Sequence, residues 1–283
     1  MKSLRKYCLL FITSVIFLLI ASFDSSFAEQ VEAERIAREP AIPHAVIEGK
    51  RLSENKWYTG TFYDLGNVVQ GTRRGEWTEV TGWLGRKQNN INVYASFSQL
   101  KRFSEKDYTG NAGLYLKFKD YYIHEELGPG WDVDFIYKFQ NIAELSHKLY
   151  KNLYWQLGYT YRHYPINDTH LVYPGLIYYI GDSYIRADYG LSRIESRGTG
   201  QFGALKGSFA VNKRLRWDVG TSVGEWLYDI YGLSAKKEYG YILYTMFNFE
   251  VTKDVRLSLG YSYGTERPQF IKRSLNVSLT ANF

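Results

Sequence analysis

From Trp57 onward, the chain is a succession of short segments in which apolar and polar side chains alternate. Successive side chains of a β-strand point to opposite faces, so each segment has one apolar and one polar face. The final segment shows the alternation most clearly, with apolar residues at Leu275, Val277, Leu279, Ala281 and Phe283. Segments of about ten residues with this pattern can cross a bilayer as strands. The period of two therefore predicts an all-β chain.

Charged side chains occupy the polar face of these segments. Arg186 and Asp188, for example, alternate with apolar neighbours. An Arg or Lys that faced lipid at the bilayer midplane would cost about 2 to 4 kcal/mol, so the charged face belongs inside a barrel. We expect these charges to line the interior: Arg186, Asp188, Lys206, Arg216, Asp218, Glu250 and Arg256. Inward tyrosines would serve either as packing or as stacking platforms for sugars: Tyr154, Tyr173, Tyr179 and Tyr244.

The number of segments and the lengths of their connections define the fold class. We count about fourteen segments, with twelve as the alternative because those near Tyr121 and Tyr137 alternate poorly. Short connections such as Lys119-Asp120 interleave with longer ones such as Val68–Gly75 and Pro165–His170. This asymmetry predicts a closed antiparallel transmembrane β-barrel with short periplasmic turns and longer surface loops.

A soluble β-sandwich, which also alternates apolar and polar residues, is the alternative fold. Aromatic residues make up 17% of the chain and crowd the ends of the segments, as at Trp57, Tyr161 and Tyr164. Aromatic girdles of this kind mark the two interfaces of a bilayer. The sequence also lacks the Cys-Trp-Cys framework of immunoglobulin sandwiches. Both features favour the barrel.

The first residues of the chain have the features of a secretory signal. A basic head precedes an apolar stretch and then Ser26-Phe27-Ala28. This order predicts a signal peptide over residues 1–28 that is cleaved near Ala28. The apolar stretch is shorter than the ~18 to 20 residues of a spanning helix, which disfavours an uncleaved anchor. We expect a periplasmic N-terminal arm over residues 29–55 and a barrel over residues 56–283, in the outer membrane of a Gram-negative cell.

The segment from Leu275 to Phe283 ends in an aromatic residue and has apolar residues at every second position before it. This pattern resembles the signal by which barrel proteins are recognised for outer-membrane assembly. The expected partners are therefore the outer-membrane lipid and the barrel assembly machinery.

Several short, aromatic-rich motifs narrow the family. They are Gly158-Tyr159-Thr160-Tyr161-Arg162-His163-Tyr164, Tyr173-Pro174-Gly175, Ala187-Asp188-Tyr189-Gly190 and Arg197-Gly198-Thr199-Gly200. With these motifs, the sequence resembles the YaiO family of outer-membrane barrel proteins over most of the chain after Trp57. The resemblance implies a mid-sized barrel for which polysaccharide is a candidate partner. It supplies no catalytic residues.

The sequence offers few residues for catalysis or metal binding. His124, His147, His163 and His170 fall in separate segments without a serine two residues away, whereas a barrel phospholipase needs a Ser and His pair. Asp168 and His170 share a predicted surface loop, either as a pair that activates water or as part of a solvated turn. The sequence contains no Cys/His cluster with zinc spacing and no nucleotide-binding fingerprint. We expect no enzymatic activity, metal or cofactor, and no nucleic-acid partner.

Three functions follow from these features. In the leading hypothesis, the inward charges line an aqueous lumen and select a polar solute or a polysaccharide, so the protein is a channel. In the second, the charges fill a closed structural or adhesive barrel that binds partners through its surface loops. In the third, the barrel is a hydrolase that uses Asp168 and His170.

Overall fold

We describe a computed structural model of the chain over residues 25–26, 56–165, 167–194, 198–227, 237–266 and 270–283. The main strands are β2 (Lys56–Gln70), β3 (Arg73–Gln88), β4 (Ile91–Arg102), β5 (Glu105–Phe118), β6 (Tyr121–Trp131), β7 (Phe139–Tyr150), β8 (Leu153–His163), β9 (Asp168–Ile180), β10 (Ser183–Ile194), β11 (Gly198–Ala210), β12 (Leu215–Leu227), β13 (Lys237–Glu250), β14 (Val255–Glu266) and β15 (Phe270–Asn282). A short β1 (Ser25–Ser26) pairs in parallel with β12. Within these ranges, no helix is long and apolar enough to cross a membrane.

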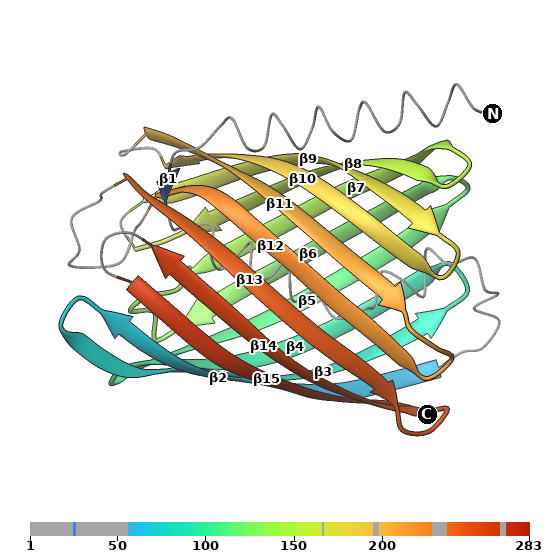
Figure 1. Cartoon of the computed structure of the whole chain (residues 1–283), viewed down its shortest axis with the longest axis horizontal. Helices are drawn as coiled ribbons and strands as arrows, with labels where there is room; N and C mark the ends of the chain where they lie inside the picture. Colours follow the sequence, from blue (N-terminus) through green and yellow to red (C-terminus); the bar gives the residue numbers. More distant parts are fainter. Residues whose placement is uncertain (1–24, 27–55, 166, 195–197, 228–236, 267–269) are drawn as a thin grey trace.

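The fourteen strands β2 to β15 form one closed antiparallel sheet. Each strand pairs with its sequence neighbours, and β15 closes the barrel on β2, with Leu275 opposite Leu65. Backbone hydrogen bonds of 2.9 Å join Trp57 and Phe283 beside this seam. Figure 1 shows the tilted strands wrapping around the barrel. The predicted all-β barrel of fourteen strands is confirmed. The predicted signal peptide and arm lie outside the described residues, apart from Ser25–Ser26.

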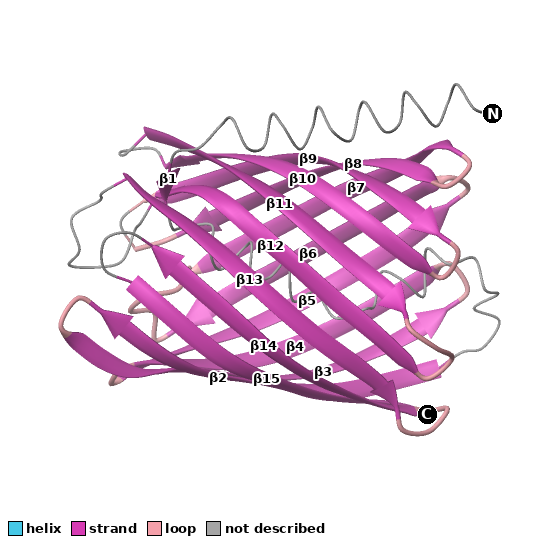
Figure 2. Ribbon diagram, in the orientation of Figure 1, coloured by secondary structure: helices cyan, strands magenta, loops and turns pink. Residues whose placement is uncertain are grey.

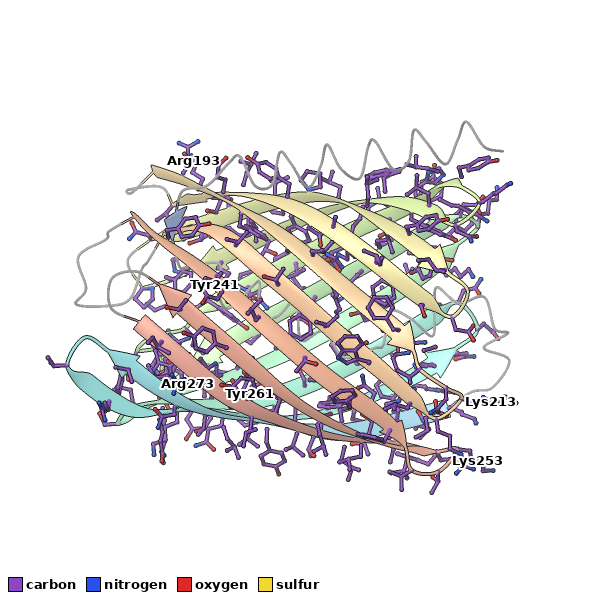
Figure 3. All side chains as sticks on the ribbon, in the orientation of Figure 1. Arg193, Lys213, Tyr241, Lys253, Tyr261 and Arg273 are labelled. Atoms are coloured by element: carbon purple, nitrogen blue, oxygen red, sulfur yellow. The ribbon has the colours of Figure 1, made fainter. Side chains whose placement is uncertain are left out.

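Side chains alternate between the outer surface and the interior of the barrel, as the sequence pattern predicts. Leu65 and Leu275 point outward and are 53% and 59% exposed, whereas Asp64 and Ser274 point inward and are buried. Side chains project from the outer surface along the whole barrel (Figure 3). Many of the exposed side chains are large and apolar. An apolar outer surface of this extent is suited to contact with lipid.

Glycines let large aromatic side chains lie against the inner wall. Tyr173 on β9 is directly opposite Gly158 on β8, and a Cβ atom at Gly158 would lie 2.0 Å from the ring carbon Cζ of Tyr173. Such a ring extends along the wall instead of across the interior. The same arrangement joins other register partners: Tyr58 with Gly85, Trp83 with Gly60, Tyr94 with Gly113, Phe202 with Gly190 and Tyr244 with Gly220.

The connections between strands differ in length at the two ends of the barrel (Figure 2). The end that we call the turn end has the connections 89–90, 119–120, 151–152, 181–182, 211–214 and 251–254. The other end, the loop end, has the connections 71–72, 103–104, 132–138, 164–167, 195–197, 228–236 and 267–269.

The prediction of a long connection over Val68–Gly75 is wrong, because β2 and β3 continue as a paired hairpin through these residues. The hairpin ends in a tight turn at Gly71, whose positive φ of 59° suits a residue without a Cβ atom. The predicted loop Pro165–His170 is also shorter than expected, since β9 already begins at Asp168. The first longer connection at the loop end is therefore 132–138, which follows β6.

Candidate functional site

A network of buried and half-buried polar side chains lines the inside of the barrel from β4 to β10. At its centre, Oε1 of Glu144 accepts hydrogen bonds from Gln156 Nε2 at 3.1 Å and from Tyr173 Oη at 2.9 Å. Oε2 of Glu144 lies 3.0 Å from Nδ1 of His124. Nη2 of Arg186 lies 3.6 Å from Oε1. One carboxylate on β7 thus joins side chains from β6, β8, β9 and β10.

The network extends toward the loop end through a second carboxylate, Glu126 on β6. Tyr94 donates a hydrogen bond to Glu126 and also lies 3.0 Å from Nε2 of His124. Gln140 Nε2 donates to Glu126 at 3.1 Å, and Arg162 Nε donates to Gln140 Oε1 at 2.8 Å. We call the whole network the polar belt: Tyr94, His124, Glu126, Gln140, Glu144, Gln156, Arg162, Tyr173, Arg186 and Asp188.

Arg186 and Asp188 end the polar belt on β10. Arg186 Nε lies 2.7 Å from Asp188 Oδ2, and the two side chains are 9% and 1% exposed. Charges this far from solvent need partners, because desolvation costs several kcal/mol per ion. The structure places both residues inside the barrel, where the sequence pattern puts them.

Of the other inward charges named from the sequence, Lys206 is level with Arg186, and the rest lie nearer the turn end. Lys206 on β11 is buried and directly opposite Arg186. Arg216 donates to Ser208 Oγ at 3.0 Å and to the carbonyl oxygen of Asp182 at 2.9 Å. The remaining three are held by polar partners: Asp218 accepts hydrogen bonds from Asn248 Nδ2 at 2.8 Å and from Ser208, and Arg256 Nη2 lies 3.5 Å from Glu250 Oε1.

An ion pair on the opposite wall was not anticipated from the sequence. Lys272 Nζ on β15 lies 2.8 Å from Asp64 Oδ2 on β2, and Asn276 Nδ2 donates to Asp64 Oδ1 at 3.1 Å. The pair bridges the seam that closes the barrel. The available signal was the position of Asp64 between the apolar Tyr63 and Leu65, which places a charge on the inner face.

The connection 132–138 folds over the interior at the loop end, which the sequence also did not indicate. The buried Asp107 carboxylate on β5 accepts hydrogen bonds from the backbone N–H groups of Asp134, Phe135 and Ile136, at 3.1, 2.8 and 2.8 Å. The guanidinium of Arg102 lies 4.6 Å from the ring centre of Phe135. Asp107 and Arg102 both face inward, so this loop narrows the interior.

The four inward tyrosines divide into two groups. Tyr173 and Tyr244 are buried, and both cover a glycine of the neighbouring strand, as packing residues do. Tyr154 and Tyr179 are half-buried near the turn end, with ring centres 5.3 Å apart.

The structure places Asp168 and His170 on the outer face of β9 and not in a surface loop. Asp168 Oδ1 lies 2.7 Å from Nδ1 of His163, and Asp168 Oδ2 accepts a hydrogen bond from Tyr161 at 2.9 Å. His170 Nδ1 lies instead 2.8 Å from the Tyr159 hydroxyl. Asp168 and His170 therefore have different hydrogen-bond partners, although the ring of Tyr161 also lies 5.3 Å from that of His170.

In the described part of the chain, no three His, Cys, Asp or Glu side chains are grouped so that they could hold a metal ion. Buried carboxylates of the polar belt are held by amide, phenol, imidazole and guanidinium groups instead.

Comparisons with known proteins agree with this architecture. The sequence model of one family, described as the YaiO membrane beta barrel domain, matches residues 60–209. A search of curated proteins found no match. Among solved structures, the CymD monoaromatic hydrocarbon channel is similar with a TM-score of 0.60 at 7% identity, over 87% of this chain and 93% of that one.

Two further barrels have lower scores. The translocator domain of the autotransporter NalP from Neisseria meningitidis has a TM-score of 0.45 at 12% identity, over 91% of this chain and 99% of that one. The outer membrane protein opdK from Pseudomonas aeruginosa has a TM-score of 0.43 at 10% identity, over 82% of this chain and 100% of that one.

Proposed function

The chain belongs to the family of YaiO membrane β-barrel domains, and on that premise we propose that it is an outer-membrane channel for polar solutes. The observation that carries the proposal is the contrast between the apolar outer face and an interior lined by the charged and hydrogen-bonding groups of the polar belt. Apolar side chains would be sufficient to pack the interior of a closed barrel. A water-filled passage, in contrast, requires polar side chains along its wall.

The arrangement of the aromatic side chains supports the same proposal. Rings such as Tyr58, Tyr173 and Tyr244 cover glycines of the neighbouring strands, so their bulk lies along the wall and leaves the axis to polar groups. Passage would be narrowest where the loop 132–138 and the polar belt face the interior.

We orient the barrel with the turn end in the periplasm and the loop end at the cell surface, because outer-membrane barrels have short periplasmic turns. In this orientation, residues 1–28 act as a signal peptide that is cleaved near Ala28, and residues 29–55 remain in the periplasm. Leu275 to Phe283 is presented to the barrel assembly machinery. N-terminal sequencing of the mature protein tests the cleavage site.

Arg186 and Arg216 are the charges to which we assign solute selection. Both are inward guanidinium groups, and they come from neighbouring regions of the wall. The refolded chain should produce steps of ionic current in a planar bilayer, and Arg186→Gln with Arg216→Gln should change the ratio of anion to cation permeability. An open pore with unaltered selectivity in the double variant would remove the selecting role from these residues.

A closed barrel that acts through its surface loops is the second proposal. The hydrogen bonds that Gln156 and Tyr173 donate to Glu144 within the polar belt favour it, because side chains that bond to one another can fill an interior without water. A chain that shows the heat-modifiable gel mobility of a folded barrel but carries no current would support this alternative over the channel.

A further inference from the structure

The inward positions nearest the turn end form a ring of distinctive composition. Each of the strands β2 to β15 contributes one such position, and six of the fourteen carry Lys or Arg, four carry Tyr and one carries Glu. The single carboxylate, Glu250, is the partner of Arg256. We call the six cations the cationic mouth: Lys56, Lys87, Lys117, Lys148, Arg216 and Arg256.

Like charges are brought together within the cationic mouth. Lys56 and Lys87 are directly opposite each other on β2 and β3, and both face inward. Like charges directly opposite each other in a sheet are destabilising. Cations thus outnumber the single carboxylate six to one at the turn end, whereas the inward charges Arg102 and Asp107 at the loop end are one cation and one anion.

Tyrosine rings are interleaved with these cations. Ring centres are 6.0 Å apart for Tyr122 and Tyr154, 5.3 Å for Tyr154 and Tyr179, and 5.9 Å for Tyr179 and Tyr184. Lys117 Nζ lies 5.3 Å from the ring centre of Tyr122, and Lys87 Nζ lies 5.3 Å from that of Tyr58. The row of rings extends over β6, β8, β9 and β10.

We infer that this end of the barrel binds anionic saccharides that carry carboxylate groups. Ammonium and guanidinium groups form charge-assisted hydrogen bonds with carboxylates. A tyrosine ring offers an apolar face for the C–H groups of a sugar and a hydroxyl at its edge. A neutral sugar would use only the rings, and a small inorganic anion would use only the charges. The inference rests on the proposed channel, since it names the solute class that enters from the turn end.

The test measures ion selectivity and ligand block in one bilayer experiment. In a KCl gradient, the wild-type pore should prefer chloride, and hexagalacturonate should block the current at lower concentration than maltohexaose. Lys87→Gln with Lys117→Gln should reduce the chloride preference and weaken the hexagalacturonate block at least about tenfold, which is the effect of one charged hydrogen bond. Lys87→Arg with Lys117→Arg should retain both properties.

The matched control removes two positive charges from the same end but outside the ring. Lys213 and Lys253 lie in exposed turns, where Figure 3 labels them, and Lys213→Gln with Lys253→Gln should leave selectivity and block as in the wild type. Heat-modifiable gel mobility verifies that each variant is folded.

Calorimetric titration of the detergent-folded barrel with hexagalacturonate separates this inference from the channel proposal. Binding that is lost in Lys87→Gln with Lys117→Gln supports the inference even if the barrel carries no current. A conducting pore without chloride preference, equal block by the neutral and the acidic sugar, or no binding in the titration would overturn it.

Discussion

Replacement of Glu144 by alanine tests the polar belt at its centre. The substitution removes the acceptor of the hydrogen bonds from Gln156 and Tyr173 and leaves His124 and Arg186 without their shared carboxylate. Removing one partner from a buried charged pair costs about 3 to 5 kcal/mol. Two hydrogen bonds to a charged acceptor, at about 1.5 to 3 kcal/mol each, lead to a similar magnitude. We therefore expect Glu144→Ala to lower the free energy of unfolding by about 3 to 5 kcal/mol.

Urea unfolding of the refolded barrel in detergent, followed by tryptophan fluorescence, measures this loss. Glu250→Ala is the matched control, because the Glu250 side chain is 47% exposed and its pair with Arg256 is worth at most about 1 kcal/mol. Glu144→Gln, which retains an acceptor oxygen, should fall between the two. Equal unfolding midpoints for Glu144→Ala and Glu250→Ala would refute a stabilising role of the polar belt.

Three further predictions concern the wall, the loop and the outer face. Gly158→Leu should destabilise the barrel by about 1 to 3 kcal/mol through overpacking against Tyr173, whereas Gly82→Leu, with nothing within 4 Å of a new Cβ atom, should unfold like the wild type in the same urea titration. Asp107→Ala should release the loop 132–138, which limited trypsin digestion would detect as faster cleavage after Lys138; unchanged cleavage would contradict the anchoring role of Asp107. Leu275→Arg should cost about 2 to 4 kcal/mol in lipid, measured by urea titration of barrels refolded in vesicles, and a smaller loss than for Leu275→Ala would contradict its position on the lipid face.

The alternation of side chains was enough to predict the barrel and the faces of its strands. A period of two assigns Arg186 and Asp188 to the interior whatever the exact strand limits are. It does not give the height of a residue in the barrel, because height depends on the tilt and stagger of the strands. The pattern assigns His124, His147, His163 and His170 to separate segments. Because it does not give their heights, the contact of His124 with Glu144 could not be predicted.

Contacts across the seam and in the loops could not be predicted from the sequence for other reasons. Asp64 and Lys272 are 208 positions apart, and they meet only because β15 closes on β2. The anchoring of the loop 132–138 depends on three backbone N–H groups that converge on Asp107, and the residue types of Asp134, Phe135 and Ile136 do not show where their N–H groups point. The interpretation of Asp168 and His170 as loop residues failed because Pro165 suggested a longer turn than the chain forms.

Liposome swelling tests the channel most directly, because it measures the passage of a polar solute. Vesicles that contain the refolded barrel should swell in isotonic arabinose and should not swell in isotonic dextran, which is too large for a barrel of fourteen strands. Vesicles in which the barrel is inserted and folded, but which swell in neither solute, would contradict the account of the interior as a water-filled passage.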